Sequence, residues 1–156
     1  MSEAADIPDF VKGDYIVNRR ELTVEWGHCD PAGIVFHPRF IEYFDWACAL
    51  LLEKATGFKK SELRQAYGFA GFPIVDLQAK FLVPVTYGDD VKIFSTIASL
   101  KRSSFAIKHC LTKNGVVAVE CTQTRVWCVA DPADPKKLKA AAVPDEVVVR
   151  LKSRAD

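Results

Sequence analysis

The sequence predicts an α+β fold in which one curled antiparallel sheet wraps around one long central helix. One long segment, 38–56, is apolar on most of its helical faces and would therefore be buried on most sides. A run of strands follows it, and Asn114-Gly115 between two of them is a strong hairpin signal that makes those two strands antiparallel. An antiparallel sheet needs an apolar partner on its inner face, and helix 38–56 is the long apolar helix available. These patterns alone leave other α+β folds open.

The first predicted element is a strand that precedes Asp30. Apolar and polar side chains alternate along it, with Leu22, Val24 and Trp26 on one side and Glu21, Thr23 and Glu25 on the other. The sequence Asp-Pro-Ala-Gly then continues neither a strand nor a helix, because Pro31 lacks an N–H and Gly33 admits backbone angles closed to other residues. A turn is therefore predicted at 30–33.

The long helix begins after Pro38, and Gly57 suits its C-cap. Its apolar residues leave only a narrow polar strip, formed by Arg39, Glu42, Asp45 and Glu53. The elements predicted after it are a short surface helix at 61–67, strands at 75–83, 90–100, 104–113 and 116–130, a polar loop around Pro132 and Pro135, and a short C-terminal helix opened by Val143-Pro144. One sheet is expected to contain all of these strands.

The composition is that of one ordinary soluble domain. The chain has 156 residues, 49% of them hydrophobic, and a domain of this size buries about two thirds of its unfolded surface. We expect an N-terminal extension over 1–14 and a single domain over 15–156. The net charge of +1 gives no broad basic field for nucleic acid or an anionic membrane, so neither partner is expected. The N-terminus has neither the basic head nor the apolar core of a signal peptide, and we expect a cytoplasmic protein.

Five cysteines make an odd count without a Cys-x-x-Cys pair: Cys29, Cys48, Cys110, Cys121 and Cys128. Neither a disulfide framework nor a zinc site is indicated, and free thiols inside strands usually act as small apolar side chains.

Asp30 is the first candidate for chemistry, because it stands where a strand passes into a helix. The first N–H groups of that helix have no intrahelical acceptor, so they could polarise a carbonyl oxygen beside the carboxylate. The alternative is structural, since an Asp before a Pro often only caps a turn. His28 and Cys29 do not suit a nucleophile–base pair, because adjacent strand residues point to opposite faces.

The run from Gly27 to Pro38, with the helix through Phe40, Tyr43, Phe44 and Asp45, resembles the 4-hydroxybenzoyl-CoA thioesterase family of hotdog-fold proteins. The resemblance continues in Gly71-Phe72-Pro73-Ile74-Val75 and in Lys101-Arg102-Ser103-Ser104-Phe105, so it covers roughly residues 15 to 150. The segment Asp-Pro-Ala-Gly-Ile-Val-Phe is the specific part, and the other two segments support it. A hotdog fold and acyl-CoA thioester hydrolysis are what this resemblance implies.

The resemblance also implies roles for individual residues. Asp30 would be the catalytic carboxylate, as nucleophile or as base for water, and the backbone N–H of His37 would bind the thioester oxygen. Relatives commonly carry tyrosine where this chain has His37, which leaves the shape of the acyl pocket open. Gly33 and Phe36 would lie against the substrate. The neighbouring subunit of a dimer would supply Gly71, Phe72 and Pro73, in a homo-oligomer expected to be a tetramer built from two dimers with shared active sites.

Two further sites are implied at the ends of the substrate. Lys101, Arg102, Ser103 and Ser104 would hold the phosphates of coenzyme A, although a Lys-Arg pair on a loop is often only solvated. Asp45 could receive a ring hydroxyl of the acyl group, or it could be no more than part of the polar strip.

The predicted function is hydrolysis of an aryl-CoA, of the hydroxybenzoyl-CoA or benzoyl-CoA type, without metal or cofactor. The alternatives are a short- or medium-chain aliphatic acyl-CoA thioesterase, and a non-catalytic acyl-CoA-binding hotdog protein. A dehydratase would need a histidine and a carboxylate that converge on one carbon, and neither His28 nor His109 has such a partner by spacing. We expect His109 to be a packed or surface histidine.

Overall fold

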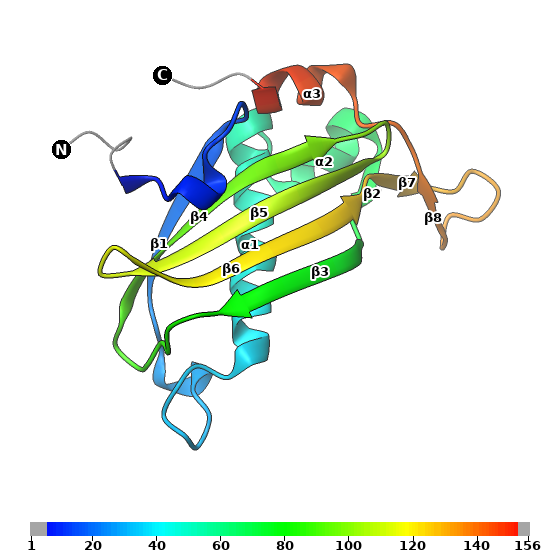
Figure 1. Cartoon of the computed structure of the whole chain (residues 1–156). Helices are drawn as coiled ribbons and strands as arrows, with labels where there is room; N and C mark the ends of the chain where they lie inside the picture. Colours follow the sequence, from blue (N-terminus) through cyan, green and yellow to red (C-terminus); the bar gives the residue numbers. More distant parts are fainter. Residues whose placement is uncertain (1–5, 153–156) are drawn as a thin grey trace.

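The computed structural model describes residues 6–152, and it confirms the α+β architecture with a sheet packed around one long helix (Figure 1). The main sheet has five strands in the order β1-β4-β5-β6-β3, and each neighbouring pair is antiparallel. Its strands are β1 (Val17–Thr23), β3 (Ile74–Phe81), β4 (Asp90–Leu100), β5 (Ser104–Lys113) and β6 (Val116–Val126).

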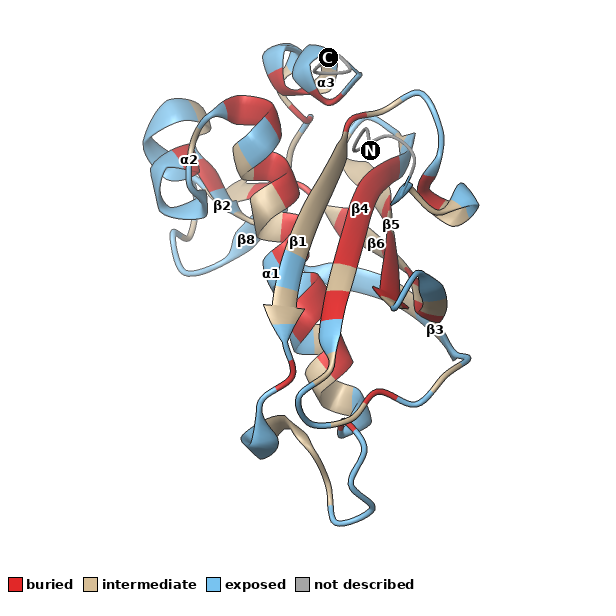
Figure 2. Ribbon diagram, turned by 90° about the vertical axis from the view of Figure 1, so that its left-hand side faces the viewer, coloured by how far each residue is buried: buried red, intermediate tan, exposed pale blue. Residues whose placement is uncertain are grey.

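Three helices and two 3₁₀ turns complete the main body of the described chain: α1 (His37–Thr56), α2 (Lys60–Tyr67), α3 (Asp145–Lys152), η2 (Asp9–Val11) and η3 (Trp26–His28). Helix α1 lies along the inner face of the main sheet, as Figures 1 and 2 show. Its buried residues, which face the sheet and the other two helices, are Phe40, Tyr43, Phe44, Ala47, Cys48, Leu51, Leu52, Ala55 and Thr56. The helix ends at Gly57, whose positive φ of 76° lets its N–H reach the Glu53 carbonyl at 2.8 Å.

The predicted hairpin at Asn114-Gly115 joins β5 and β6. Asn114 and Gly115 have φ angles of 51° and 76°, which is the left-handed pair of residues that a tight two-residue hairpin turn needs. All five cysteines are free, as expected for reduced thiols.

The first strand was predicted to run through Trp26, and this was wrong. Strand β1 ends at Thr23, whose partner Asp90 is the first residue of β4, so the chain beyond it has no neighbouring strand to pair with. Trp26 instead lies in η3 and is 79% exposed.

The prediction of one sheet was also wrong. A second, three-stranded sheet has the order β2-β7-β8, with β2 (Phe69–Gly71), β7 (Cys128–Ala130) and β8 (Leu138–Ala140). The strand predicted at 116–130 breaks at buried Trp127, whose N–H donates to the Ser103 carbonyl at 2.7 Å. The chain thereby changes sheets, and β8 forms inside the segment that was predicted to be a polar loop.

The N-terminal segment covers the opposite face of the main sheet from α1 (Figure 1). Val11 packs there against Phe94 and Cys110, and all three side chains are buried. Residues 1–5 of the expected extension, and residues 153–156 of the expected domain, lie outside the described residues.

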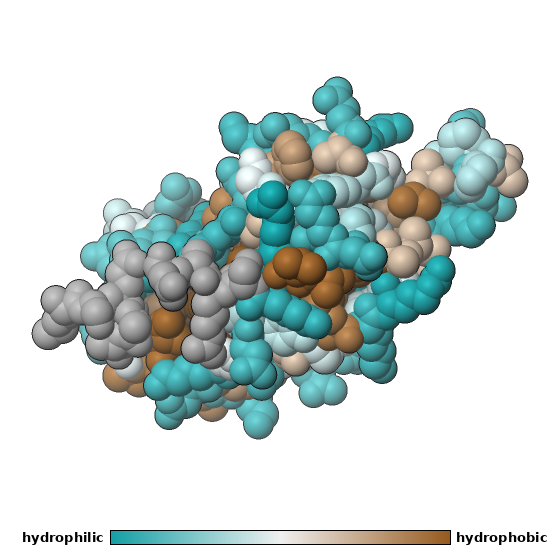
Figure 3. Space-filling model, turned by 90° about the horizontal axis from the view of Figure 1, so that it is seen from above, coloured by the Kyte–Doolittle hydropathy of each residue, from teal (hydrophilic) through white to brown (hydrophobic). Residues whose placement is uncertain are grey.

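Seen from the end that carries α3, hydrophilic side chains surround several smaller hydrophobic groups, and the projecting loop between β7 and β8 is mainly hydrophilic (Figure 3). Between residues 6 and 152, no helix combines the length and the apolar character needed to cross a membrane.

Candidate active site

Asp30 lies in a tight turn that its own side chain helps to hold. The Asp30 carbonyl accepts the Gly33 N–H at 2.9 Å, and its Oδ1 accepts the Ala32 N–H at 2.8 Å. The structural role of Asp30 as a turn cap is therefore real, but it occupies only one carboxylate oxygen. Gly33 has a φ of 84°, in the left-handed region that favours glycine, which explains why this residue type stands at this position.

The segment between Asp30 and α1 is fixed on both sides. Cys29 and Val35 form an isolated antiparallel bridge, and the Val35 N–H donates to the Val85 carbonyl at 2.7 Å. The Phe36 N–H donates to the His28 carbonyl at 2.9 Å. These contacts hold the turn against the main body, so Asp30 belongs to a shaped loop rather than to a free one.

Helix α1 begins at His37 without a side-chain cap. Phe36 occupies the N-cap position and has no side-chain acceptor to offer, and Pro38 has no N–H. Within the described part of the chain, the backbone N–H of His37 has no hydrogen-bond acceptor. A helix start of this kind can receive a carbonyl oxygen or an anion.

A polar contact that the sequence did not reveal lies behind this loop. Nδ1 of His28 and the hydroxyl oxygen of Tyr43 are 2.7 Å apart, and burial raises the pKa of Tyr43 to about 12. His28 therefore faces α1, while the Cys29 thiol lies 3.9 Å from the Glu25 carbonyl. The expectation that His28 and Cys29 do not pair holds, although η3 rather than strand alternation is the reason.

A second group of predicted residues surrounds an open hollow of about 400 Å³ beside the middle of α1. Gly71, Phe72, Pro73 and Asp45 line it, together with Lys60, Ile74, Arg125 and Leu138. The structure thus brings Asp45 together with the Gly-Phe-Pro segment of the same chain. None of Asp30, Gly33, Phe36 or His37 lines this hollow.

Arg125 is the residue of this hollow that sequence reasoning missed. Only 4% of its side chain is exposed, and its guanidinium pairs with Asp45 at 2.8 Å. Arg125 lies on β6 at the inward phase of an alternating strand, in step with buried Cys121 and Gln123. An arginine at an inward-facing position of an alternating strand was the sequence signal that could have identified it.

A buried histidine lies next to this arrangement. His109 is fully buried, stacks on Phe44 with ring centroids 5.0 Å apart, and has its Nδ1 2.7 Å from the Ser95 hydroxyl. Burial lowers the pKa of His109 to about 3, so the imidazole is neutral. This confirms the expectation of a packed histidine.

The predicted coenzyme A residues form a third, separate group at the turn between β4 and β5. Lys101 and Arg102 are exposed, and the Lys101 N–H donates to the Ser104 carbonyl at 2.8 Å. The Ser103 and Arg102 carbonyls accept the Trp127 and Val143 N–H groups, which fixes the backbone of the turn.

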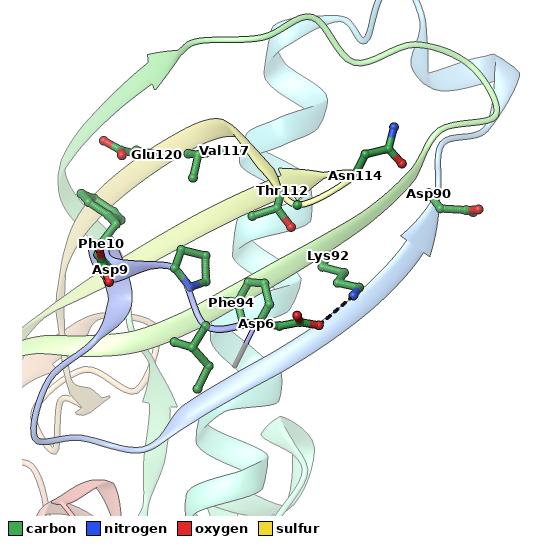
Figure 4. Close-up of a pocket in the computed structure, with 13 residues that line it drawn as sticks. Asp6, Asp9, Phe10, Asp90, Lys92, Phe94, Thr112, Asn114, Val117 and Glu120 are labelled. Carbon is green, nitrogen blue, oxygen red and sulfur yellow. Dashed lines mark hydrogen bonds and ion pairs between the residues drawn. The ribbon is translucent and has the colours of Figure 1, made fainter. Parts of the chain in front are cut away.

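A larger hollow, of about 770 Å³, lies elsewhere. It is on the outer face of the sheet, between the N-terminal segment and strands β4 to β6, where an ion pair of 3.2 Å joins Lys92 to Asp6 (Figure 4). None of the predicted site residues lines it. Among residues 6–152, no three His, Cys, Asp or Glu side chains are grouped as the ligands of a metal ion would be.

Residues 24–151 match the family model described as the thioesterase-like superfamily. The chain is 29% identical over 130 residues to the 4-hydroxybenzoyl-CoA thioesterase of Pseudomonas sp. (strain CBS-3), a match that covers 80% of this chain and 90% of that protein.

Two solved structures are similar over most of their length. One is an aspartate-to-asparagine mutant of 4-hydroxybenzoyl-CoA thioesterase complexed with 4-hydroxybenzoyl-CoA, with a TM-score of 0.80 and 25% identity over 86% of this chain and 98% of that one. The other is a gentisyl-coenzyme A thioesterase, with a TM-score of 0.73 and 34% identity over 84% of this chain and 99% of that one. These similarities confirm the predicted hotdog fold.

Proposed function

The chain belongs to the thioesterase-like superfamily, and from that premise we propose that it hydrolyses an aryl-CoA thioester with Asp30 as the catalytic carboxylate. That the chain is an acyl-CoA thioesterase of the hotdog superfamily follows from the family and from its named relatives. The same finding sets aside the non-catalytic binding protein, because these relatives are thioester hydrolases.

One observation carries the assignment of Asp30. Its carboxylate uses Oδ1 to hold the turn, while Oδ2 has no hydrogen-bond partner within residues 6–152, on a loop that leads directly into the uncapped start of α1. A carboxylate oxygen and an unpaired N–H are the two groups that thioester hydrolysis needs: one acts at the carbonyl carbon, the other at the carbonyl oxygen.

The proposed reaction uses these groups in turn. The thioester carbonyl accepts a hydrogen bond from the His37 N–H, and a preorganised donor of this kind contributes about 2.7–4 kcal/mol in other enzymes. Asp30 then either attacks the carbonyl carbon, to form an anhydride that water cleaves, or removes a proton from the attacking water. In both cases the C–S bond breaks, coenzyme A leaves as a thiolate that takes up a proton, and the acyl group leaves as the acid.

The aryl preference is supported by the substrates named for the relatives, 4-hydroxybenzoyl-CoA and gentisyl-CoA, which both carry an aromatic acyl group. It is also supported by the walls of the hollow beside α1, where Phe72, Pro73 and Ile74 offer apolar surface to a flat group. Gly33 and Phe36 are proposed to contact the acyl group near the thioester, where exposed Phe36 borders the catalytic loop.

The nucleotide end of coenzyme A is proposed to lie on Lys101, Arg102, Ser103 and Ser104. The turn that carries them has a fixed backbone and two exposed cations, an arrangement suited to phosphate groups.

We also propose that the chain forms a dimer with shared active sites, and a tetramer from two such dimers. Strand β3 is an edge of the main sheet and exposes apolar Val75 and Phe81, so a second copy could continue the sheet there. Sedimentation equilibrium at micromolar concentration should give a dimer or tetramer, and Val75→Asp should weaken it. Val149→Asp on α3 is the matched control, because Val149 is equally exposed, at 65% against 63%. A monomeric wild type would contradict the shared site.

Release of free thiol from a panel of acyl-CoAs tests the proposed function. We expect kcat/KM for benzoyl-CoA and 4-hydroxybenzoyl-CoA to exceed that for hexanoyl-CoA. A preference for hexanoyl-CoA would favour the aliphatic alternative and overturn the aryl assignment.

A further inference from the structure

We propose that Arg125 is a positioning residue that makes the hollow beside α1 select acyl groups carrying a hydrogen-bond donor, by holding one oxygen of Asp45 and leaving the other open. This inference rests on the proposed function. It concerns how the protein distinguishes aryl-CoA substrates and not how it cleaves them.

The contacts of Arg125 fix it in a single orientation. Its Nη2 donates to Oδ1 of Asp45 at 2.8 Å and to Oε1 of Gln123 at 3.0 Å, while Nε donates to the same Gln123 oxygen at 3.1 Å. Its Nη1 donates to the Phe72 carbonyl at 3.0 Å, and its guanidinium carbon lies 5.0 Å from the centre of the Phe72 ring. A planar fork held on three sides is a rigid support for the group that it touches.

These contacts also decide what Arg125 itself can bind. A guanidinium has five N–H donors, and four of its N–H···O contacts are already made to protein atoms. Arg125 therefore has too few open N–H groups to bind a substrate carboxylate in a bidentate way.

The unpaired hydrogen-bonding group of the hollow is instead the Asp45 carboxylate. About half of its side chain, 53%, is exposed, and Oδ2 has no hydrogen-bond partner within the described residues. Phe72, Pro73, Ile74 and Leu138 supply apolar surface around it. An apolar hollow with one open acceptor suits a flat apolar group that carries a hydroxyl, and the hydroxyl would donate to Oδ2.

Stability alone does not account for the ion pair between Arg125 and Asp45. Replacing a buried ion pair with apolar residues of similar volume is often neutral or stabilising, so a buried guanidinium is weak evidence for a structural role. The inner-face neighbours of Arg125 are mostly apolar, and α1 meets them with Phe44 and Cys48. A buried charged side chain with four hydrogen bonds at this place therefore indicates a functional role, and the exposed end of the pair is Asp45.

Gln123 and Arg125 act together as the support. They lie two residues apart on the same face of β6, and both side chains are buried, at 0% and 3% exposure. Without the Gln123 oxygen, the guanidinium would lose two of its four contacts and with them the orientation that places Asp45.

The test compares benzoyl-CoA with 4-hydroxybenzoyl-CoA, which differ by one hydroxyl. In Arg125→Met the ratio of kcat/KM for the hydroxylated over the plain substrate should fall by about 10- to 100-fold, the range expected for a lost hydrogen bond to a charged group. Turnover of benzoyl-CoA should fall less than turnover of 4-hydroxybenzoyl-CoA, because benzoyl-CoA makes no contact with Oδ2. Asp45→Ala should lower the same ratio, since it removes the acceptor itself.

Arg125→Lys provides a second variant in case the methionine variant does not fold, because it keeps the charge and loses the fork. It should lower the ratio to an intermediate value. Arg150→Met is the matched control, since Arg150 forms an arginine–carboxylate pair with Glu146 at 3.3 Å on α3, and it should leave the ratio unchanged.

The outcomes separate the inference from the proposed function. An equal loss of activity on both substrates in Arg125→Lys or Arg125→Met would mean that Arg125 only supports the fold, and would overturn the inference. An unchanged ratio in Asp45→Ala would overturn it as well. Absence of thiol release from every acyl-CoA by the wild-type protein would overturn the proposed function instead.

Discussion

Two regions border the same helix and are built in different ways. The Asp30 turn and the start of α1 are made by residues within a few positions of each other, through short-range backbone contacts such as that of Gly33 with Asp30. The hollow beside the middle of α1 depends on Arg125 and Asp45, which are 80 positions apart in the chain. The comparison teaches that in this protein the groups proposed for bond cleavage are presented locally, whereas those proposed for selectivity are assembled by packing.

The largest effect should come from Asp30→Asn, which keeps the turn and removes the charge. An asparagine oxygen can still accept the Ala32 N–H, so the melting temperature should stay close to that of the wild type. The loss of a catalytic carboxylate should lower kcat by about a thousandfold or more, while acyl-CoA binding persists. Asp14→Asn, at an exposed position, is the control. Near-normal kcat in Asp30→Asn would remove Asp30 from the mechanism.

Gly33→Ala should break the local region through its backbone alone. A Cβ at Gly33 would meet no atom within 4 Å, but the φ of 84° is strained for alanine and costs about 1–2 kcal/mol. A turn displaced by about 1 Å can cost up to about 100-fold in rate, so kcat should fall by up to that amount. Gly115→Ala meets the same strain at a φ of 76° in the β5–β6 hairpin, away from the site. It should lose similar stability with unchanged kcat, and a similar loss of kcat in both variants would mean that the effect is one of stability.

His109 tests the packed region through its pH dependence. Its pKa is about 3 in the folded protein against an ordinary value of 6.5, because burial disfavours the charged imidazolium. Between these two values the unfolded chain binds the proton more tightly, so the free energy of unfolding should fall as the pH falls from 6.5 towards 3. The contribution of one such group is about 1.4 kcal/mol per pH unit, or tenfold in the unfolding equilibrium.

Denaturant unfolding at a series of pH values measures this slope. His109→Gln removes the titrating group. The free energy of unfolding of this variant should therefore change less steeply with pH than that of the wild type, by up to about 1.4 kcal/mol per pH unit. Parallel slopes in the two proteins would mean that His109 does not titrate in this way.

The smallest effect is expected at the β4–β5 turn. Changing Lys101 and Arg102 together to Ala should raise KM about fivefold, or about 1 kcal/mol, with little change in kcat, because the contact is remote from the thioester and equal in ground and transition states. The difference should shrink as salt rises. It should vanish with an acyl-pantetheine, which lacks the nucleotide phosphates. A loss of kcat, or an equal loss with acyl-pantetheine, would place the nucleotide end of coenzyme A elsewhere.

Sequence reasoning found the elements whose signals are local. The Asn114-Gly115 turn, the C-cap at Gly57 and the turn at Asp30 each depend on the backbone preferences of one or two residues, and each is present in the structure. It failed where pairing partners decide the outcome. Trp26 continues the alternation of β1 but has no strand to pair with, and Trp127 moves the chain from one sheet to the other.

By itself, the sequence determined an apolar helix within an antiparallel α+β fold, the family resemblance, and the short segment that carries Asp30 and the start of α1. Hydrophobic periodicity and backbone preference act within a few residues, so these features can be predicted from a single sequence. Only the tertiary structure decided that Arg125 meets Asp45, that Gln123 holds it, and that the Gly71–Pro73 segment lines the same hollow. Those contacts join strands and a helix far apart in the chain, and a charged residue on an inward strand face finds its partner only when the core closes around it.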